Sequence, residues 1–542
     1  MSSTSDSNMP RGRKITRRKF VALIGVIVGS VSVASCGSQA VTPTTTPSAQ
    51  ITAPAPSASQ VPPAAGKRGG KLVYAHRADI FSFDPSQLPI GNWPMYHTVY
   101  DPVVRLDQKL QPHPALAESW DSDSSGKQLT LKLRKGVLFH SGREFNADDI
   151  VFNIARYQDP ATAANMRPQV SLIKDVKVRD PYTVVLEFEA PNPLIFDTLD
   201  LLFIIDKDGV VQIKNKGAGT GPFKFAEWSP GDKARFVRNE NYWNKTEPYL
   251  DEVIIQAFPD QQSMATALQA GTVHVAETPT AQDFLRLKDN RNLQSINSRS
   301  AIVVNVNFNV ENPNLANKYV RQAINHAIDR TRFSEIAYQG LTKPTCQPAP
   351  NGSWAFFPDL EDACKFDLGL AKSLLEKGGA AGGFEIEALV STAASPESPV
   401  LAQIMRDDLE KIGIKLKITD LEPTAYRAMG DGAKFPGLYI QAYGRSTKDP
   451  GSVFGTTVPF RPQTNVARFR SDEYERLIAD GASTLDQDKR KEIYRKLNQI
   501  LLDEAFALSI APRIDLFLFS AKLKNLELST DGMPYLGRVW FE

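Results

Sequence analysis

The clearest hydrophobic pattern in the chain predicts a strand, a helix and a second strand in its last third. Apolar and polar residues alternate at Phe384–Val390 and again at 414–418, as they do in half-buried strands. Apolar residues recur at helical spacing between these segments. Ser398 and Pro399 indicate the start of the helix, and Gly413 indicates its end. This order implies a right-handed unit with two parallel strands.

Other segments repeat the alternation of helix and strand. A polar helix is predicted at 423–429, followed by an apolar strand at 438–443 that leads into the loop 444–451. Asp260 is expected to cap a further helix, which ends at Gly271. Ligands of open α/β sheets bind beyond the carboxyl ends of strands. The loop after residue 443 is therefore a candidate ligand loop.

The stretch 127–188 has a different, two-residue period. Leucines alternate with polar residues at 129, 131 and 133, and further apolar alternation surrounds the Asp180-Pro181 turn. This pattern predicts an antiparallel, strand-rich insertion in an otherwise α/β chain.

The N-terminal segment has the layout of an export signal. Arg17 and Arg18 precede the apolar stretch 20–34, and small residues then lead to Cys36. The twin arginine resembles a Tat signal, and the ending resembles a lipobox in which Cys36 becomes the lipidated first residue. The alternative is a membrane anchor, but about 15 uncharged residues, which include two glycines and two serines, are fewer than the roughly 20 that span a bilayer. We therefore expect cleavage of residues 1–35.

Residues 36–66 are expected to form a disordered tether. No Asp, Glu, Lys or Arg occurs from Phe20 to Gly66, and 22 of the 30 residues at 37–66 are Ala, Ser, Thr or Pro. Such a segment has too little apolar surface to offset the entropy of ordering.

Loss of the signal also reverses the sign of the net charge. The whole chain has a formal charge of +2, and removal of residues 1–35 leaves 57 basic and 60 acidic residues, a charge of about −3. The remaining body carries no basic excess, so we do not expect nucleic acid as a partner.

The chain carries few signs of catalysis or metal binding. It contains no zinc-protease, serine-hydrolase or P-loop motif, and its six histidines are scattered. The glycine-rich stretch 217–221 is followed by Pro222, which favours a turn between domains over a phosphate loop. Adjacent acids occur at 148–149 and 407–408, and solvated ion pairs on a helix surface explain the second pair. We expect no metal, no cofactor and no enzyme activity.

Two cysteines remain in the body once Cys36 is lipidated. Cys346 and Cys364 are 18 residues apart and flank a loop rich in Pro, Gly and Trp. An even pair outside the cytoplasm favours a disulfide. The alternative is two buried thiols.

Several aromatic residues lie in segments predicted to be loops or strand ends. Each one alone is more typical of a protein core, but as a group they are also typical of the wall of a ligand pocket. These residues are Trp93, Tyr96, Trp354, Phe356, Tyr439 and Tyr443.

A series of short motifs resembles the oligopeptide-, dipeptide- and nickel-binding proteins of ABC importers, the family 5 extracellular solute-binding proteins. The motifs occur in the family's order, and the resemblance extends from about Gly69 to at least Leu508, which is most of the body. They are GGKL at 69–72, FDP at 83–85, VYD at 99–101, PALAESW at 114–120, LKLRKGVLFH at 131–140, FNADDIV at 145–151, GTGPFKF at 219–225, RNENYW at 238–243, LQAG at 268–271, VRQAI at 320–324 and AIDR at 327–330.

The resemblance implies an α/β, two-lobed fold like that of type II periplasmic binding proteins, with a hinge between the lobes and an extra strand-rich subdomain. Solute is expected to bind between lobes that close over it. The implied division places lobe I at 67–106, 217–304 and 512–542, its subdomain at 107–216, and lobe II at 305–511.

The resemblance also suggests ligand-binding residues. In peptide-binding relatives an Asp in a loop of the second lobe pairs with the peptide amino group, and the matching residue here is Asp449. The alternative is a carboxylate that caps its own backbone. Arg445 and Lys448 flank it and either neutralise it or bind an acidic group of the solute. Trp93, Trp354, Tyr443 and Arg445 complete the expected ligand-binding set.

The sequence as a whole predicts a monomeric, lipid-anchored receptor outside the cytoplasm. It would capture a peptide or similar small solute and deliver it to an ABC permease, held at the membrane through Cys36 in a periplasm or on a cell surface. The alternative is a tethered hydrolase acting on peptides or glycans, and a chemosensory receptor would share the fold.

Overall fold

The computed structural model describes residues 66–88, 92–258, 260–349, 351–444, 449–529 and 531–542. All of them belong to one unit, Ala49–Glu542. No helix within these ranges has the length and apolar character that crossing a membrane requires. The predicted signal, the tether and Cys36 lie outside the described residues.

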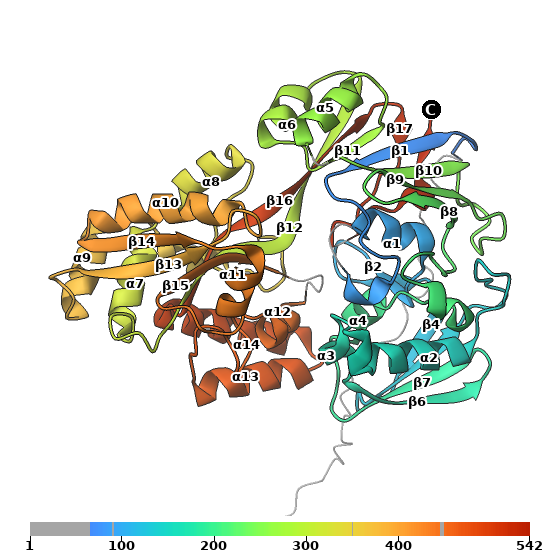
Figure 1. Cartoon of the computed structure of the whole chain (residues 1–542). Coiled ribbons are helices and arrows are strands. Elements are labelled where there is room, and N and C mark those ends of the chain that lie inside the picture. Colours follow the sequence, from blue (N-terminus) through green and yellow to red (C-terminus); the bar gives the residue numbers. More distant parts are fainter. Residues whose placement is uncertain (1–65, 89–91, 259, 350, 445–448, 530) are drawn as a thin grey trace, which may run out of the picture. The chain divides into compact units, whose positions relative to one another are not determined.

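The described residues form a mixture of helices and strands, as the sequence predicts (Figure 1). The strands are β1 Lys71–His76, β2 Val104–Leu106, β3 Pro112–Pro114, β4 Ala117–Ser122, β5 Gln128–Leu133, β6 Ile173–Asp180, β7 Thr183–Phe188, β8 Phe223–Ser229, β9 Lys233–Arg238, β10 Glu252–Ala257, β11 Val275–Glu277, β12 Leu293–Phe308, β13 Phe384–Val390, β14 Ile414–Asp420, β15 Leu438–Tyr443, β16 Ala507–Ser520, β17 Leu523–Lys524 and β18 Trp540–Phe541. The helices are α1 Trp93–Val99, α2 Ala147–Gln158, α3 Arg167–Val170, α4 Ile195–Leu201, α5 Gln261–Gln269, α6 Ala281–Leu287, α7 Lys318–Ala327, α8 Arg330–Tyr338, α9 Leu368–Lys377, α10 Glu397–Glu410, α11 Pro423–Gly430, α12 Pro450–Thr456, α13 Asp472–Ser483 and α14 Gln487–Glu504.

Within the described residues, one ten-stranded sheet runs through the molecule in the order β14-β13-β15-β12-β16-β11-β1-β10-β9-β8. We call lobe I the part built from β1 to β11 and α1 to α6, and lobe II the part built from β13 to β15 and α7 to α14. Each part has hydrophobic core clusters of its own. The long strands β12 and β16 belong to both.

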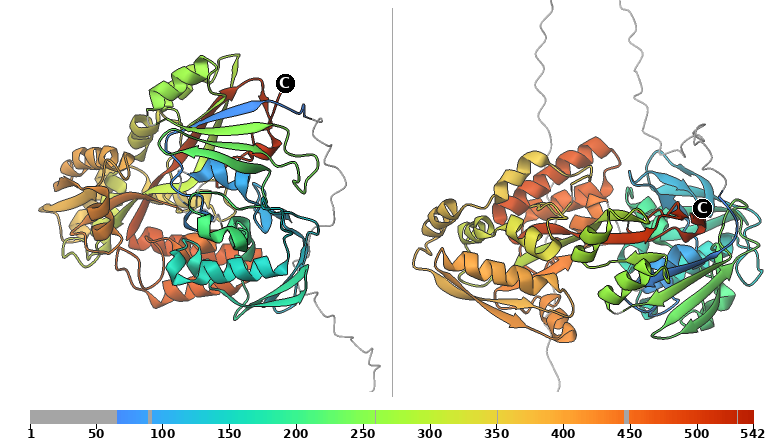
Figure 2. Two further views of the ribbon diagram at one scale, coloured as in Figure 1. Left: turned by 45° about the vertical axis from the view of Figure 1, so that its right-hand side comes forward. Right: turned by 90° about the horizontal axis from the view of Figure 1, so that it is seen from above.

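β12 and β16 are the two strands that connect the lobes (Figures 1 and 2). They pair antiparallel along most of their length, with register shifts between Arg299 and Val303 and between Val304 and Asn305. On one side of the first shift β16 pairs with β11 of lobe I, and on the other side β12 pairs with β15 of lobe II. A pair of strands with an irregular register at the crossing is a suitable place for a hinge.

The predicted strand-helix-strand unit is confirmed in lobe II. β13 and β14 pair in parallel, and α10 lies between them in sequence and packs its apolar side into the lobe II core. The predicted helix start was wrong. α10 begins at Glu397, and Ser398 lies in its first turn. The Ser398 hydroxyl accepts a hydrogen bond from the Ser391 N–H at 3.2 Å, so its oxygen ties the helix to the end of β13 and does not cap it.

Residues 107–216 contain a separate antiparallel sheet, in the order β4-β5-β7-β6 among the described strands. The strand-rich pattern predicted between 127 and 188 is thereby confirmed. Helix α2 packs on this sheet through Ile150, Ile154 and Tyr157, which are buried in the lobe I core.

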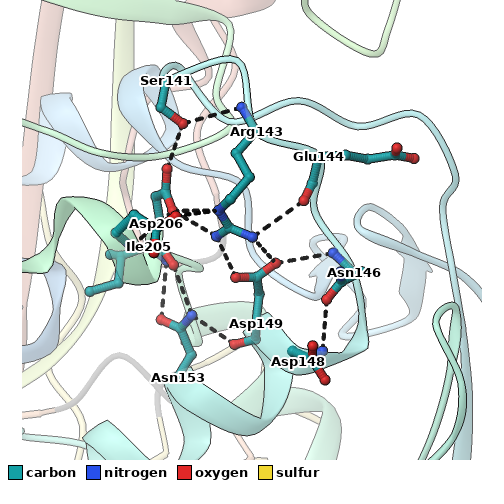
Figure 3. Close-up of polar contacts among 10 residues, drawn as sticks. Ser141, Arg143, Glu144, Asn146, Asp148, Asp149, Asn153, Ile205 and Asp206 are labelled. Atoms are coloured by element: carbon teal, nitrogen blue, oxygen red, sulfur yellow. Dashed lines mark hydrogen bonds and ion pairs between the residues drawn. The ribbon is translucent and has the colours of Figure 1, made fainter.

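Arg143 joins this sheet region to the following loop through two buried carboxylates (Figure 3). Its guanidinium donates to Asp149 at 2.5 and 3.0 Å and to Asp206 at 2.6 and 2.9 Å. Asp149 also accepts the Asn146 N–H and so completes the capping box of α2. Asp206 accepts the Ser141 hydroxyl at 2.6 Å. Of the acid pair at 148–149, Asp149 therefore has a structural role, because it binds Arg143 and caps α2.

The glycines of the stretch 217–221 permit close packing of two backbones. A Cβ atom on Gly219 would lie 2.1 Å from the Val99 carbonyl oxygen, and the Gly221 N–H donates to that oxygen at 3.0 Å. The favoured interpretation as a structural turn fits this packing, since any side chain at residue 219 would collide with the end of α1.

Candidate functional site

Two cavities lie where the crossing strands β12 and β16 meet residues of both lobes. They share two lining residues, Ile302 on β12 and Arg513 on β16, so they adjoin each other beside the register shift. Clefts between domains are common ligand sites. This pair of cavities is therefore the candidate site for a small ligand.

The first cavity, which we call the Trp93 cavity, has a volume of about 360 Å³. Lobe I provides most of its wall, and α8 and α10 of lobe II complete it. It is lined by Arg77, Trp93, Gln261, residues 277–281, Ile302, Ala337, Tyr338, Pro396, Glu397 and residues 513–516.

The second cavity, which we call the Tyr443 cavity, has a volume of about 470 Å³. Lobe II provides most of its wall, and the segment around α3 contributes from lobe I. It is lined by Asn165, Pro168, Gln169, Ile302, Ala394, Ser395, Tyr426, Arg427, Asp431, residues 441–444, residues 456–458, Arg461 and Arg513.

An ion pair between Arg513 and Glu397 lies at the cavities, since Arg513 lines both of them and Glu397 lines the Trp93 cavity. The Arg513 Nε donates to Glu397 Oε1 at 2.8 Å, and the Ser395 hydroxyl donates to the same oxygen at 3.0 Å. Burial alone would lower the pKa of Arg513, but the adjacent carboxylate of Glu397 outweighs it and raises that pKa above its usual value. Because Glu397 opens α10 and Arg513 lies on β16, this pair fixes the start of the helix to the crossing strand.

Two of the predicted ligand-binding aromatics line these cavities. Trp93 is the first residue of α1, and it lines the Trp93 cavity together with Asp515. Tyr443 ends β15, and its hydroxyl donates to Asp431 at 2.9 Å. Burial and the neighbouring Tyr439 and Asp431 raise the pKa of Tyr443, so it stays a neutral hydroxyl at ordinary pH.

Asp449 is buried and bound to a residue that the sequence did not identify, Arg490 of α14. Both carboxylate oxygens accept from its guanidinium, one of them at 3.0 Å. Asp449 is also the N-cap of α12, where it accepts the Gly451 N–H at 2.8 Å. The capping role that the sequence left open is present. A role as the partner of a solute amino group stays a prediction, and neither described cavity is lined by Asp449.

Trp354 belongs to the same cluster as Asp449. Its ring lies 5.2 Å from the Arg490 guanidinium and 5.5 Å from the Tyr494 ring, measured to the centroids. The structure thus places Trp354 against Arg490, outside the lining of the two described cavities. Its predicted contact with the ligand stays a prediction.

The remaining predicted residues fall into two groups. Cys346 and Cys364 form a disulfide, with their Cα atoms 5.9 Å apart, within the usual range for such bonds. Arg445 and Lys448 lie outside the described residues. Within the described ranges, no three His, Cys, Asp or Glu side chains come together in a way that could hold a metal ion.

The arginines that line the Tyr443 cavity were not predicted from the sequence. Arg427 follows Tyr426 on α11, Arg461 follows α12 after a short loop, and Arg513 lies next to Pro512 on β16. Arg513 and Glu397 are 116 residues apart. No local pattern indicates such a pairing, because only the packing of α10 on β16 brings the two side chains together.

A contact between the lobes forms at Asp449. Its N–H donates to Asp197 Oδ2 of α4 at 3.1 Å. Burial, and then the negative charge of Asp449, raise the pKa of Asp197 well above its usual value. Asp197 therefore binds a proton more readily in the folded protein than in the unfolded chain.

Replacement of Asp197 by asparagine is expected to stabilise the protein at pH 7. The pKa of Asp197 in the folded protein lies above the unfolded value of about 3.9, so the stability of the wild type falls as the pH rises above about 4. An asparagine side chain does not ionise, and the variant therefore avoids this loss of stability. We expect a gain of about 0.5–2 kcal/mol at pH 7 that disappears near pH 4, measured by urea unfolding at both pH values. Asp289→Asn, at a side chain 85% exposed, is the control. A gain that persists unchanged at pH 4 would contradict this explanation.

Comparison with known proteins places the chain among binding proteins of bacterial importers. Residues 111–462 match the model of the bacterial extracellular solute-binding proteins, family 5 Middle. The heme-binding protein A of Haemophilus influenzae is 27% identical over 469 residues, which cover 80% of this chain and 85% of that protein. The di/tripeptide-binding protein 1 of Pseudomonas aeruginosa is also 27% identical, over 80% of this chain and 87% of its own length.

Solved structures give the same result for the fold. An ABC transporter-associated periplasmic binding protein of Helicobacter pylori, in complex with the peptide STSA, superimposes with a TM-score of 0.75. It is 26% identical and covers 88% of this chain and 99% of its own. The two-lobed, type II periplasmic-binding-protein fold that the sequence predicted is thereby confirmed.

Proposed function

The chain belongs to the bacterial extracellular solute-binding proteins, family 5, and from this membership we propose that it captures a peptide or similar small solute for an ABC import permease. It performs no covalent chemistry on the solute in this proposal. The names of the relatives support a peptide, since a di/tripeptide-binding protein and a peptide complex are among them. They also include a heme-binding protein.

The observation that carries the proposal is the position of the two cavities. Both are lined by residues from each lobe, and both adjoin the crossing strands at Ile302 and Arg513. A solute held there would touch both lobes at once. Closure about β12 and β16 would then bury it and present a closed form to a transporter.

We propose further that the protein works at the outer face of the cell membrane. The support is the N-terminal sequence, in which Arg17 and Arg18 precede an apolar stretch and Cys36 follows small residues. A lipid on Cys36 and the charge-free segment 37–66 would keep a monomeric receptor close to its permease. Mass measurement of Cys36 in protein from membranes tests the anchor, and an unmodified thiol there would refute it.

Peptide binding can be tested directly with unlabelled mixtures. The protein is incubated with pools of dipeptides and tripeptides, and both the rise in melting temperature and the mass of each recovered ligand are measured. We expect a higher melting temperature and intact peptides, because a bound ligand stabilises the folded state by mass action. Recovery of cleaved products would favour the tethered hydrolase. A chemosensory role would give the same binding, and pull-down of the partner from solubilised membranes separates the two receptors.

A further inference from the structure

We propose that closure of the two lobes takes up a proton at the contact between Asp197 of lobe I and Asp449 of lobe II, so that the protein holds its solute more tightly in acid. The inference rests on the proposed function, to which it adds a dependence on pH. It depends on three observations: the contact joins the two lobes, both carboxylates are buried there, and a cation binds only one of them.

The first observation is the position of the contact. Asp197 belongs to α4, which packs against β2 in lobe I, and Asp449 is the N-cap of α12 in lobe II. The Asp449 N–H donates to Asp197 Oδ2 at 3.1 Å. The Leu194 side chain lies against the next turn of α12, because a Cβ atom on Gly451 would be 3.1 Å from its Cδ2. Parting of the lobes about β12 and β16 would break this contact and expose Asp197 to water.

The second observation is the burial of the two acids. Asp197 and Asp449 are each only 7% exposed. Two ionised carboxylates that share a buried site repel each other, and each loses hydration, so one of them takes up a proton instead. In agreement, burial and then the charge of Asp449 raise the pKa of Asp197 well above its usual value.

The third observation decides which of the two carboxylates holds the proton. Asp449 accepts hydrogen bonds from two nitrogens of Arg490 and from the Gly451 N–H, and these donors favour its ionised form. Among the described residues, no cation pairs with Asp197, and the Asp449 N–H is the one group that donates to it. The proton therefore belongs on Asp197.

The other charged groups of lobe I do not neutralise Asp197. Asp200 on the same helix and Asp531 in the loop before β18 are acidic, and their charges raise the pKa of Asp197 further. The cation on β2, the strand that packs against α4, is Arg105, and it binds Asp101 at 2.9 Å. Lobe I thus adds negative charge near the contact and favours the proton.

On the lobe II side, α14 carries the two polar groups that face the contact. Arg490 is bound to Asp449, and the Tyr494 hydroxyl stays neutral because burial raises its pKa. Helix α12 itself contains no charged side chain. Arg445 and Lys448 lie outside the described residues. The described groups of lobe II therefore provide no further cation for the acid of lobe I.

These contacts fix the direction of the pH dependence. With the lobes apart, Asp197 would face water and have an ordinary pKa of about 3.9. In the closed form its pKa is higher, so closure binds a proton between about pH 4 and the closed-form value. The free energy that this proton contributes to closure is present below the window and is lost as the pH rises through it. Each pH unit in the window should therefore weaken solute binding by up to about tenfold.

The test uses a pool of tripeptides with uncharged side chains, whose own charges hardly change between pH 5 and pH 7. Dissociation constants are measured by calorimetry at both pH values. We expect the wild type to bind roughly 10- to 100-fold more tightly at pH 5, and Asp197→Asn to bind equally at both, as tightly as the wild type does at pH 5. Calorimetry at pH 6 in buffers of different ionisation enthalpy should count about one proton taken up by the wild type and none by the variant.

Asp289→Asn is the matched control, since it makes the same change at a side chain that is 85% exposed. It should keep the pH dependence of the wild type, and the melting temperature of each ligand-free variant shows whether it folds. The proton count for the wild type requires no variant. If wild-type affinity does not depend on pH, or if Asp197→Asn shows the same dependence, proton uptake at this contact is refuted and the proposed function stands.

A ligand-free measurement separates this inference from the proposed function. If the tripeptides bind at neither pH, peptide binding is refuted, and small-angle X-ray scattering of the free protein then decides whether the contact responds to protons. The radius of gyration of the wild type should be smaller at pH 5 than at pH 8, and that of Asp197→Asn should be equal at both. A wild-type radius that is the same at both pH values would refute proton-linked closure.

Discussion

Replacement of Arg490 by methionine is expected to lower the free energy of unfolding by about 3–5 kcal/mol, the usual cost of leaving a buried charge without its partner. The Arg490 side chain is 5% exposed and binds both oxygens of Asp449. It also donates to the Tyr494 hydroxyl at 2.9 Å and to the Gly481 carbonyl at 3.2 Å. Without the guanidinium, Asp449 would face Asp197 with no cation beside it.

Arg495 on the same helix provides the matched control for Arg490. It pairs with Asp359, but its side chain is 32% exposed and that of Asp359 is 58% exposed. Exposed ion pairs contribute at most about 1 kcal/mol. Urea unfolding of Arg490→Met and Arg495→Met should therefore differ several-fold in the free energy lost. Equal losses would show that the buried pair contributes no more than a surface pair.

The double variant Asp449→Asn with Arg490→Met tests the cause of the loss. It removes both charges, so we expect it to be more stable than Arg490→Met alone, because the uncompensated carboxylate is what costs free energy. A double variant less stable than Arg490→Met would show that lost packing, and not lost charge, dominates.

The single variant Asp449→Asn addresses the predicted contact with a solute amino group. Because Arg490 already occupies both oxygens of Asp449, we expect the affinities for peptides with free and with acetylated amino termini to change equally. A selective loss for free amino termini would instead establish the predicted ligand role. The same affinities decide between the two roles that the sequence left open.

The local elements of lobe II could be predicted because their signals are local. Ile386, Ala388 and Val390 of β13 are buried, as the alternation predicts, although Leu389 is buried as well. The positive φ of Gly413 ends the connection after α10 as expected. The start of α10 could not be predicted in this way. Ser398 is a good capping residue, but the nearby Ser391 N–H uses its hydroxyl, a choice that depends on the tertiary position of the strand end.

The burial of charged residues was the main feature that the sequence did not indicate. Asp408 was expected in a solvated pair on a helix surface, and this was wrong: it is 1% exposed and accepts from the Lys411 ammonium at 2.8 Å. The partner of Asp449 lies 41 residues away on another helix. Charged residues give the same sequence pattern whether they are solvated or paired in the core, so only the packing of the helices distinguishes the two.

The candidate site was predictable where it depends on strand ends. Tyr443 follows from the rule that ligands collect beyond the carboxyl ends of strands, and the structure places it in a cavity wall. Arg427 and Gln441 were not identified. Residues two apart on β15 share a face, so alternation from Tyr443 could have led to Gln441. Nothing local leads to Arg427, because its helix reaches the cavity only through the fold of lobe II.

Arg143 is the second position at which we expect a large effect. Replacement by methionine should destabilise the protein by about 3 kcal/mol, because Asp149 and Asp206 would lose their common cation. Their side chains are 0% and 2% exposed, whereas that of Arg143 is 24% exposed, so solvent reaches the cation more easily than the acids. Arg143→Lys should recover only part of the loss, since one ammonium cannot replace the guanidinium fork that bonds to both carboxylates.

The loss at Arg143 should also depend on pH in a defined direction. Burial alone would raise the pKa of Asp206, but the Ser141 hydroxyl and the Arg143 guanidinium outweigh it and lower that pKa below its usual value. A lowered folded-state pKa stabilises the protein above the unfolded value of about 3.9, and this stabilisation is lost as the pH falls through the folded value. Without Arg143 that contribution is smaller, because only the Ser141 hydroxyl and the Asp208 N–H still donate to Asp206. Urea unfolding at pH 7 and pH 4 should therefore show a difference in unfolding free energy between wild type and Arg143→Met that is smaller at pH 4 than at pH 7.

Arg286→Met is the control, because it breaks a pair whose arginine is 52% exposed. It should lower the free energy of unfolding by less than about 1 kcal/mol. An Arg143→Met loss as small as that, or one that widens in acid, would contradict the assigned role of the two carboxylates.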